Sequence, residues 1–186
     1  MIVVLGVGLI LVAAVAAINL FLSAGMIHRL REVHTAMIDW TDRVNANSLR
    51  AGLRQGEPIP DFSATTLDDG GLTRQAMIGQ PWILGFFAGG CGSCRVDLPR
   101  LGDAIRTAQI PTKTLIVIDG EAQQSADLVA MARTFGTTVL EPPEGDLSKA
   151  FKILFFPSFY MTDDSGRVVV GSNSLDDLRR AMASPL

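Results

Sequence analysis

The chain has 186 residues, a formal net charge of −3 and 48% hydrophobic residues. That length suits one ordinary domain with additional segments, and a slightly acidic chain offers no basic surface for nucleic acid. A structural zinc site needs about four nitrogen or sulfur ligands. The chain has only two cysteines, and its only histidines, His28 and His34, lie far upstream of them. We therefore expect neither a metal nor a cofactor.

The first segment, residues 2–22, contains no charged residue and one strongly polar residue, Asn19. About 20 apolar residues suffice to cross the hydrocarbon core of a membrane as a helix. A secretory signal peptide would begin with a basic region and end at a small-x-small cleavage site. No basic residue precedes Arg29, and Ala14-Val15-Ala16 lies inside the apolar run. We therefore expect an uncleaved transmembrane anchor over residues 1–25.

Residues 26–55 predict a juxtamembrane helix followed by a linker. Apolar side chains recur there at steps of three and four and form one helical stripe: Leu30, Val33, Met37, Trp40 and Val44. The stripe spans about two heptads, which is too short to establish a coiled coil. We expect it to pack on the membrane surface or on the chain's own domain, and a homodimer through stripe and anchor is the alternative. Glycines and prolines between residues 45 and 60 indicate the linker.

Residues 56–186 predict one α/β domain. Apolar runs bounded by turn residues predict strands, at 62–66, 72–73, 82–87, 114–118, 137–140, 158–162 and 168–170. Helical periodicity predicts helices, from near Cys94 past Ile105, at 126–135, at 145–151 and from 174 onward. Pro99 should kink the first of these helices. Strands that alternate with helices and end in a hairpin and a helix predict a mixed sheet.

The two cysteines, Cys91 and Cys94, stand between the 82–87 strand and the first helix. At such a junction Cys91 would lie over the helix N-terminus, whose partial positive charge favours a thiolate. The thiolate is the species that attacks disulfides. A static structural disulfide is the alternative, but a ring this short gains little chain-entropy stabilisation. The spacing therefore favours a redox couple.

Taken together, these segments resemble the thioredoxin superfamily, and more narrowly the membrane-anchored thiol–disulfide oxidoreductases of the TlpA/ResA type. Three stretches carry the resemblance: residues 56–62 (GEPIPDF), 86–99 (FFAGGCGSCRVDLP) and 151–168. The resemblance covers nearly all of the domain. It implies a thioredoxin-like fold, with a mixed central sheet flanked by helices and an N-terminal β-hairpin extension, behind one transmembrane helix.

The resemblance also implies roles for individual residues. Cys91 would be the exposed, attacking cysteine and Cys94 the buried, resolving one. Pro157 would be a cis-proline that faces the disulfide and presents the backbone of Phe156 to a substrate strand. Gly90 stands beside this substrate-binding surface, where the family usually has a tryptophan, so that no aromatic wall is expected next to the sulfur.

Asp97 follows Cys94 by three residues, so the two share a helix face. The TlpA/ResA type carries an acid there, which implies that Asp97 exchanges the proton that the resolving cysteine must lose. An acid in the first turns also suits the helix dipole without any catalytic role, and both interpretations stay open. Thioredoxins place a buried acid in the preceding strand, where this chain has Gly85. Asp97 would then act alone.

The favoured function is that of a membrane-tethered thiol–disulfide oxidoreductase that reduces specific extracytoplasmic protein disulfides. Such proteins serve cytochrome c maturation or a similar assembly task. Their partners are proteins with disulfides or dithiols, and a membrane electron-transfer protein that recharges them. The Gly-Ser pair between the cysteines does not fix the redox direction.

Two alternatives stay open. One is a MauD-like oxidant or isomerase for methylamine dehydrogenase maturation, which the tail 171–175 resembles, although Gly92 replaces that type's proline. The other is a non-enzymatic, anchored assembly module whose cysteines are structural or carry copper, and the lack of Met or His beside the motif argues against copper. A peroxiredoxin is disfavoured because Ala88 stands where its threonine would be.

The signals for membrane orientation conflict. Arg29 and Arg31 follow the apolar segment and no basic residue precedes it, which under the positive-inside rule places the domain in the cytoplasm. A cytoplasmic thiol pool would keep both cysteines reduced. We therefore expect a single-pass protein of the cell membrane whose C-terminal domain is extracytoplasmic.

Overall fold

The computed structural model describes residues 52–108 and 112–183. Their five-stranded sheet has the order β5-β4-β3-β6-β7. The strands are β3 (Trp82–Ala88), β4 (Lys113–Asp119), β5 (Thr137–Glu141), β6 (Ser158–Thr162) and β7 (Val168–Ser172). Strands β3, β4 and β5 are parallel, whereas β6 is antiparallel to both β3 and β7. The predicted mixed sheet is confirmed.

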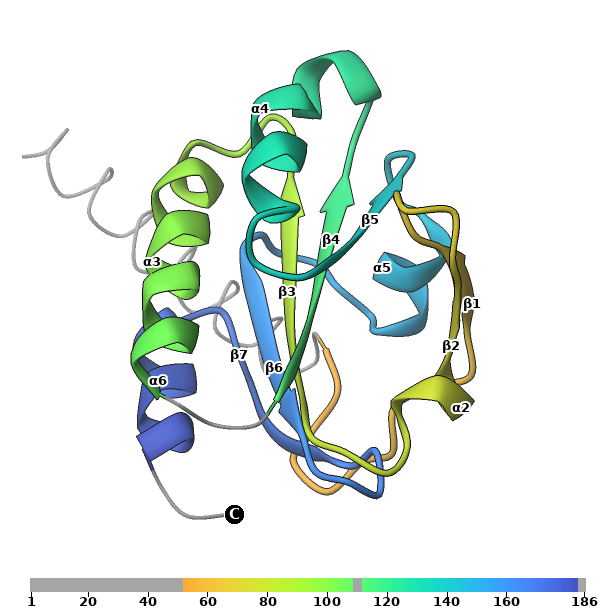
Figure 1. Cartoon of the computed structure of the whole chain (residues 1–186), viewed down its shortest axis with the longest axis vertical. Helices are drawn as coiled ribbons and strands as arrows, with labels where there is room; N and C mark the ends of the chain where they lie inside the picture. The colour runs from red at the N-terminus through yellow and green to blue at the C-terminus, as the bar shows by residue number, and fades with distance from the viewer. Residues whose placement is uncertain (1–51, 109–111, 184–186) are drawn as a thin grey trace, which may run out of the picture. The chain divides into compact units, whose positions relative to one another are not determined.

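Both faces of this sheet are covered (Figure 1). One face carries the helices α3 (Gly92–Ala108), α4 (Ala122–Ala132) and α6 (Leu175–Ala183). The other carries α5 (Asp146–Ala150) and the N-terminal hairpin of β1 (Ser63–Thr65) and β2 (Gly71–Thr73), followed by α2 (Arg74–Met77). The predicted hairpin is therefore confirmed, and it forms a two-stranded sheet of its own.

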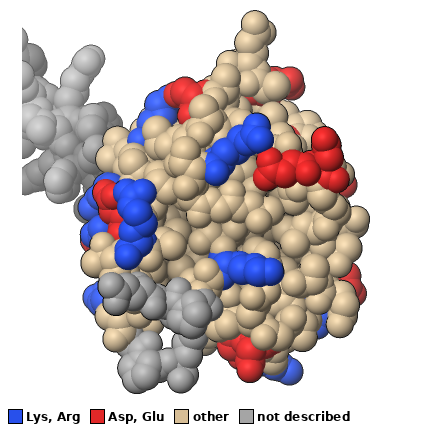
Figure 2. Space-filling view, viewed as in Figure 1, with Lys and Arg blue, Asp and Glu red and all other residues tan. Residues whose placement is uncertain are grey.

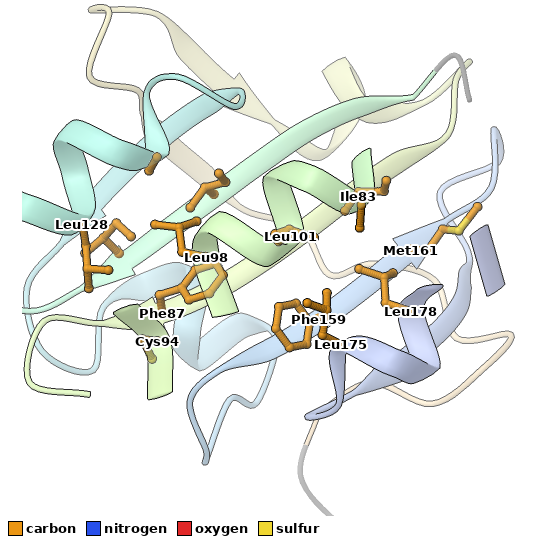
Figure 3. Close-up of a cluster of buried hydrophobic side chains, with 14 of the residues drawn as sticks. Ile83, Phe87, Cys94, Leu98, Leu101, Leu128, Phe159, Met161, Leu175 and Leu178 are labelled. Atoms are coloured by element: carbon orange, nitrogen blue, oxygen red, sulfur yellow. The ribbon is translucent and has the colours of Figure 1, made fainter. Parts of the chain in front are cut away.

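Two apolar clusters lie on the two faces of the sheet. Figure 3 shows the first, in which Leu98 and Leu101 of α3 lie against Phe87 of β3. Cys94 belongs to this cluster and is fully buried. The second cluster lies under the hairpin and α5, where the ring of Phe86 is 5.1 Å from that of Phe151, centroid to centroid. Helix α3, which begins beside the two cysteines, and the hairpin thus rest on separate cores.

Strand β3 is the central strand of the sheet. Its residues Trp82 to Phe87 are all buried. Gly85 in its middle has a packing reason. A Cβ added there would lie 2.7 Å from Cε2 of Phe87 and 3.0 Å from Cδ2 of Leu101, which is too close without movement of a core side chain. The place where thioredoxins carry a buried acid is thus filled by a ring and a leucine.

Most differences from the predicted elements lie at element ends. Helix α3 begins at Gly92, two residues before the expected start at Cys94, and it continues through Pro99. Helix α4 begins at Ala122 rather than at 126 and ends at Ala132 rather than at 135. Helix α2 was not predicted, because four residues are too few to show periodicity.

The chain is packed onto the domain from the beginning of the described range. The Gly52 N–H donates to the carbonyl of Lys152 at 2.9 Å, and Leu53 is buried. Tyr160 of β6 fills the space beside Gly52, whose positive φ of 76° suits a glycine. These residues lie within the predicted linker, yet they are part of the packed structure.

Tyr160 is the only tyrosine of the chain and gives a clean optical probe of this packing. Burial raises the pKa of its hydroxyl above 10.0, and a hydrogen bond with the Leu53 backbone acts in the opposite direction. Stability contributed by the neutral phenol is therefore complete below about pH 10 and is lost as the pH rises through the folded-state value. We expect tyrosinate absorbance to appear at higher pH in the folded protein than in urea. Tyr160→Phe should flatten the alkaline loss of unfolding free energy, and equal titration in both states would contradict the prediction.

None of the helices in the described ranges has the length and hydropathy that membrane crossing requires. The predicted anchor of residues 1–25 and most of the predicted juxtamembrane part, including its apolar stripe, lie outside those ranges.

Candidate redox site

The two cysteines are joined in a disulfide at the junction of β3 and α3, with their Cα atoms 5.3 Å apart. Cys91 directly precedes the first residue of α3 and is partly exposed, whereas Cys94, in the first turn of the helix, is fully buried. A protein substrate can therefore reach the Cys91 sulfur and not the Cys94 sulfur. The disulfide has one accessible side.

Donors at the start of α3 point at the accessible sulfur. The Cys94 N–H donates to Cys91 Sγ at 3.2 Å, and the Ser93 hydroxyl oxygen also lies 3.2 Å from that sulfur. After reduction, this N–H and the hydroxyl can both donate to a Cys91 thiolate. Together with the helix dipole they favour the charged, attacking form.

The basic residue beside the cysteines is already paired. Arg95 donates to both carboxylate oxygens of Asp127 on α4, at 2.6 and 3.3 Å. This hydrogen bond holds the pKa of Asp127 below its usual range. The pair ties the first turn of α3 to α4, so the donors facing Cys91 come from the helix start rather than from a free guanidinium.

Phe156 and Pro157 lie across from the disulfide, although they are about 65 residues away in sequence. The Phe156–Pro157 peptide bond is cis, as predicted. The carbonyl oxygen of Phe156 lies 3.7 Å from Cys91 Sγ. Antiparallel pairing of β6 with β3, in which Phe86 is opposite Ser158, brings the two segments together.

Gly90 leaves the other side of the sulfur open. It is exposed, and a Cβ added to it would meet no heavy atom within 4 Å. The same holds for Gly92 between the cysteines. The missing aromatic wall that the sequence indicated is therefore open space and is not filled from another part of the described structure.

Asp97 lies on α3 with its side chain 20% exposed and forms an ion pair with Arg100 at 3.0 Å. Among the described residues, none of its hydrogen bonds or ion pairs reaches either cysteine. The structure thus brings together Cys91, Cys94, Phe156 and Pro157, and it directs the carboxylate of Asp97 toward the next turn. A role for Asp97 in proton transfer stays a prediction.

Sequence reasoning missed two exposed apolar side chains that lie close in sequence to the site residues. Leu154 and Val96 are 61% and 58% exposed, and they are the large apolar side chains that stand out on the described surface. Leu154 precedes Phe156 by two residues, and Val96 follows Cys94 by two. Exposed apolar side chains of this size can mark a binding surface. The sequence alone does not show that they are exposed, because that depends on where the strands and helices begin and end.

A cleft of about 540 Å³ lies beside Phe156. Ile153, Leu154 and Phe156 line it together with charged side chains that include Glu144 and Lys149. Figure 2 shows Lys and Arg interspersed with Asp and Glu on the face in view, without a continuous field of one sign. In the described part of the chain, no three His, Cys, Asp or Glu side chains are grouped to hold a metal ion.

Comparison with known proteins shows similarity to a protein family and to a curated relative. The AhpC/TSA family matches residues 55–170. The thioredoxin-like protein YneN of Bacillus subtilis (strain 168) is 26% identical over 118 residues, which span 62% of this chain and 69% of YneN.

Solved structures share the fold at low sequence identity. A secreted Mycobacterium tuberculosis disulfide oxidoreductase, described as homologous to E. coli DsbE, has a TM-score of 0.56 and 19% identity over 66% of this chain and 94% of its own. The thioredoxin domain of a thiol–disulfide oxidoreductase from Bacteroides vulgatus has a TM-score of 0.59 and 19% identity, over 69% and 94%. The predicted thioredoxin-like fold of the domain is confirmed.

Proposed function

The chain belongs to the AhpC/TSA family, and from that premise we propose that it is a thiol–disulfide oxidoreductase that reduces disulfides of extracytoplasmic proteins. One observation carries the proposal: the two cysteines are unequal. Cys91 is partly exposed, and its Sγ accepts a hydrogen bond from the Cys94 N–H, whereas Cys94 is buried. This asymmetry separates an attacking sulfur from a resolving one.

The chemistry then has two steps. The Cys91 thiolate attacks one sulfur of the substrate disulfide, and the other substrate sulfur leaves as a thiolate and takes up a proton. Cys94 then loses its proton and attacks Cys91 Sγ, which closes the Cys91–Cys94 disulfide and releases the second substrate thiol. The substrate gains two electrons and two protons, and the enzyme is left oxidised.

The surface beside the disulfide supports a protein substrate over a small molecule. The exposed side chain of Leu154 and the cleft that it lines with Phe156 offer an apolar surface to an extended polypeptide. Open space at Gly90 leaves room for the substrate's backbone on the other side of Cys91. Substrate recognition would rest on apolar contact together with mixed charges.

The membrane part of the proposal rests on the sequence. The apolar residues 2–22 are long enough for an anchor, and disulfides of client proteins persist outside the cytoplasm. Because each turnover leaves the enzyme oxidised, a reductant must recharge it, and a membrane electron-transfer partner is the source that an anchored enzyme can reach. The client would be a protein in cytochrome c maturation or a similar assembly task.

The experiment is the reduction potential of the Cys91–Cys94 pair, measured on the full chain against glutathione or dithiothreitol series. A reductant should give a value near that of thioredoxin, about −270 mV or lower. A value of roughly −120 to −180 mV, in the range of strong oxidants and isomerases, would overturn the reductant assignment in favour of the MauD-like alternative. Failure of the pair to equilibrate with either series would contradict exchange chemistry altogether.

A further inference from the structure

Asn173 lies in the turn between β7 and α6, outside the redox motif. Its side-chain amide nitrogen donates to the carbonyl of Pro157 at 3.0 Å and to the hydroxyl of Ser158 at 2.7 Å, and it lies 3.4 Å from the carbonyl of Phe155. The Ser158 hydroxyl in turn donates to the Phe155 carbonyl at 2.6 Å. One exposed side chain thus contacts the backbone on both sides of Phe156.

The turn that carries Asn173 is itself held in place. Ser172 donates to the carboxylate of Asp177 on α6 at 2.5 Å, and the Ser174 N–H donates to the Ser172 hydroxyl at 3.1 Å. Ser172 is also opposite Phe159 in the β6–β7 ladder. Asn173 is therefore fixed from both α6 and the sheet before it contacts the cis-proline segment.

The carbonyl between these contacts faces the attacking sulfur. Phe155 and Pro157 flank Phe156, whose carbonyl oxygen lies 3.7 Å from Cys91 Sγ. A carbonyl oxygen carries partial negative charge, so at this distance it disfavours the Cys91 thiolate relative to the thiol. The same backbone is where an extended substrate would pair. The position of the segment therefore bears on both sulfur chemistry and substrate binding.

We propose that Asn173 is a positioning residue of the redox site, which holds the Phe156 carbonyl against Cys91 and keeps the cis-proline segment in register for substrate. The substrate-binding half of this inference rests on the proposed function. The part that concerns the Phe156 carbonyl and Cys91 does not rest on it, because it concerns only the reactivity of the Cys91 thiol. The amide donors of Asn173, and not its bulk, carry the effect.

The test compares Asn173→Ala with Asn173→Gln, which keeps the amide donors, and with Ser174→Ala, an exposed neighbour whose side chain makes no hydrogen bond in the described structure. Insulin reduction by the full chain in the presence of dithiothreitol gives kcat and KM. Alkylation of Cys91 by iodoacetamide across pH, on the reduced protein, reports the thiolate without any substrate. Thermal unfolding confirms that each variant is folded.

For Asn173→Ala we expect KM to rise about tenfold, the effect of roughly one misplaced hydrogen bond, with kcat changed less than about twofold. Its alkylation profile should shift to lower pH, because the carbonyl no longer opposes the thiolate. Asn173→Gln should retain most of the KM and the profile, and Ser174→Ala should match the wild type. An Asn173→Ala variant with wild-type KM and alkylation overturns the proposal, as does equal impairment of the alanine and glutamine variants. If wild-type protein fails to reduce insulin, the proposed function fails, and the alkylation profiles still decide the role of Asn173.

Discussion

Replacement of Cys91 by serine should reduce disulfide exchange to the uncatalysed rate, whereas replacement of Cys94 should stop the reaction after its first step. The reason is geometric: Cys91 is partly exposed, whereas Cys94 is fully buried. Without Cys91 the one remaining thiol, that of Cys94, is buried and out of reach of a substrate. Without Cys94 the mixed disulfide has no resolving thiol and accumulates.

The measurement is insulin reduction by the full chain, together with non-reducing gels of cells that express each variant. Cys94→Ser should give covalent adducts that dithiothreitol removes, and the adducts identify client proteins. Cys91→Ser should give none. Adducts that form with Cys91→Ser instead of Cys94→Ser would reverse the assigned roles of the two cysteines.

Introducing an acid at Gly85 should destabilise the domain by about 2–6 kcal/mol rather than supply a proton acceptor. A Cβ at this position already lies 2.7 Å from Phe87 and 3.0 Å from Leu101. Overpacking of a core costs about 1–3 kcal/mol, and a buried polar group without a partner costs a further 1–3 kcal/mol, roughly. A thermal midpoint about 10 °C lower is expected for a chain of this size.

Gly71→Asp is the matched control, because Gly71 is an exposed residue of β2 with no heavy atom within 4 Å of its added Cβ. Urea unfolding of both variants gives the comparison. A Gly85→Asp protein that is as stable as Gly71→Asp and reduces insulin faster than the wild type would show that the strand can accept a buried acid after all.

The sheet was predictable because its signals are local. The run Trp82–Phe87 is apolar at every position except Gly85, and it forms the fully buried centre of β3. The start of α3 was predicted two residues late because Gly92 and Ser93 are weak helix formers. In the structure the first turn of α3 begins at Gly92, and the Cys94 N–H in that turn donates to Cys91 Sγ. Helix α2 and the early start of α4, at Ala122, lacked an apolar periodicity altogether.

The candidate site was predictable only in part. The spacing of Cys91 and Cys94 was enough to predict a redox pair. Pro157 was predicted from the family resemblance, and the structure confirms its cis peptide bond. The contacts of Asn173 depend on the β6–β7 register and on residues 15 to 18 positions away, which no local pattern encodes. The pairing of Asp97 with Arg100, rather than with the cysteines, depends on side-chain direction along one helix face.

Phe156 packs against both apolar clusters, the one beneath the redox helix and the one beneath the hairpin. A substitution of Phe156 that adapts the surface to a new client protein would therefore disturb the packing of both clusters at once. Leu154, 61% exposed and two positions away, carries no such constraint. Divergence among relatives should accordingly concentrate at Leu154 and its exposed neighbours, with Phe156 varying only among side chains of similar volume.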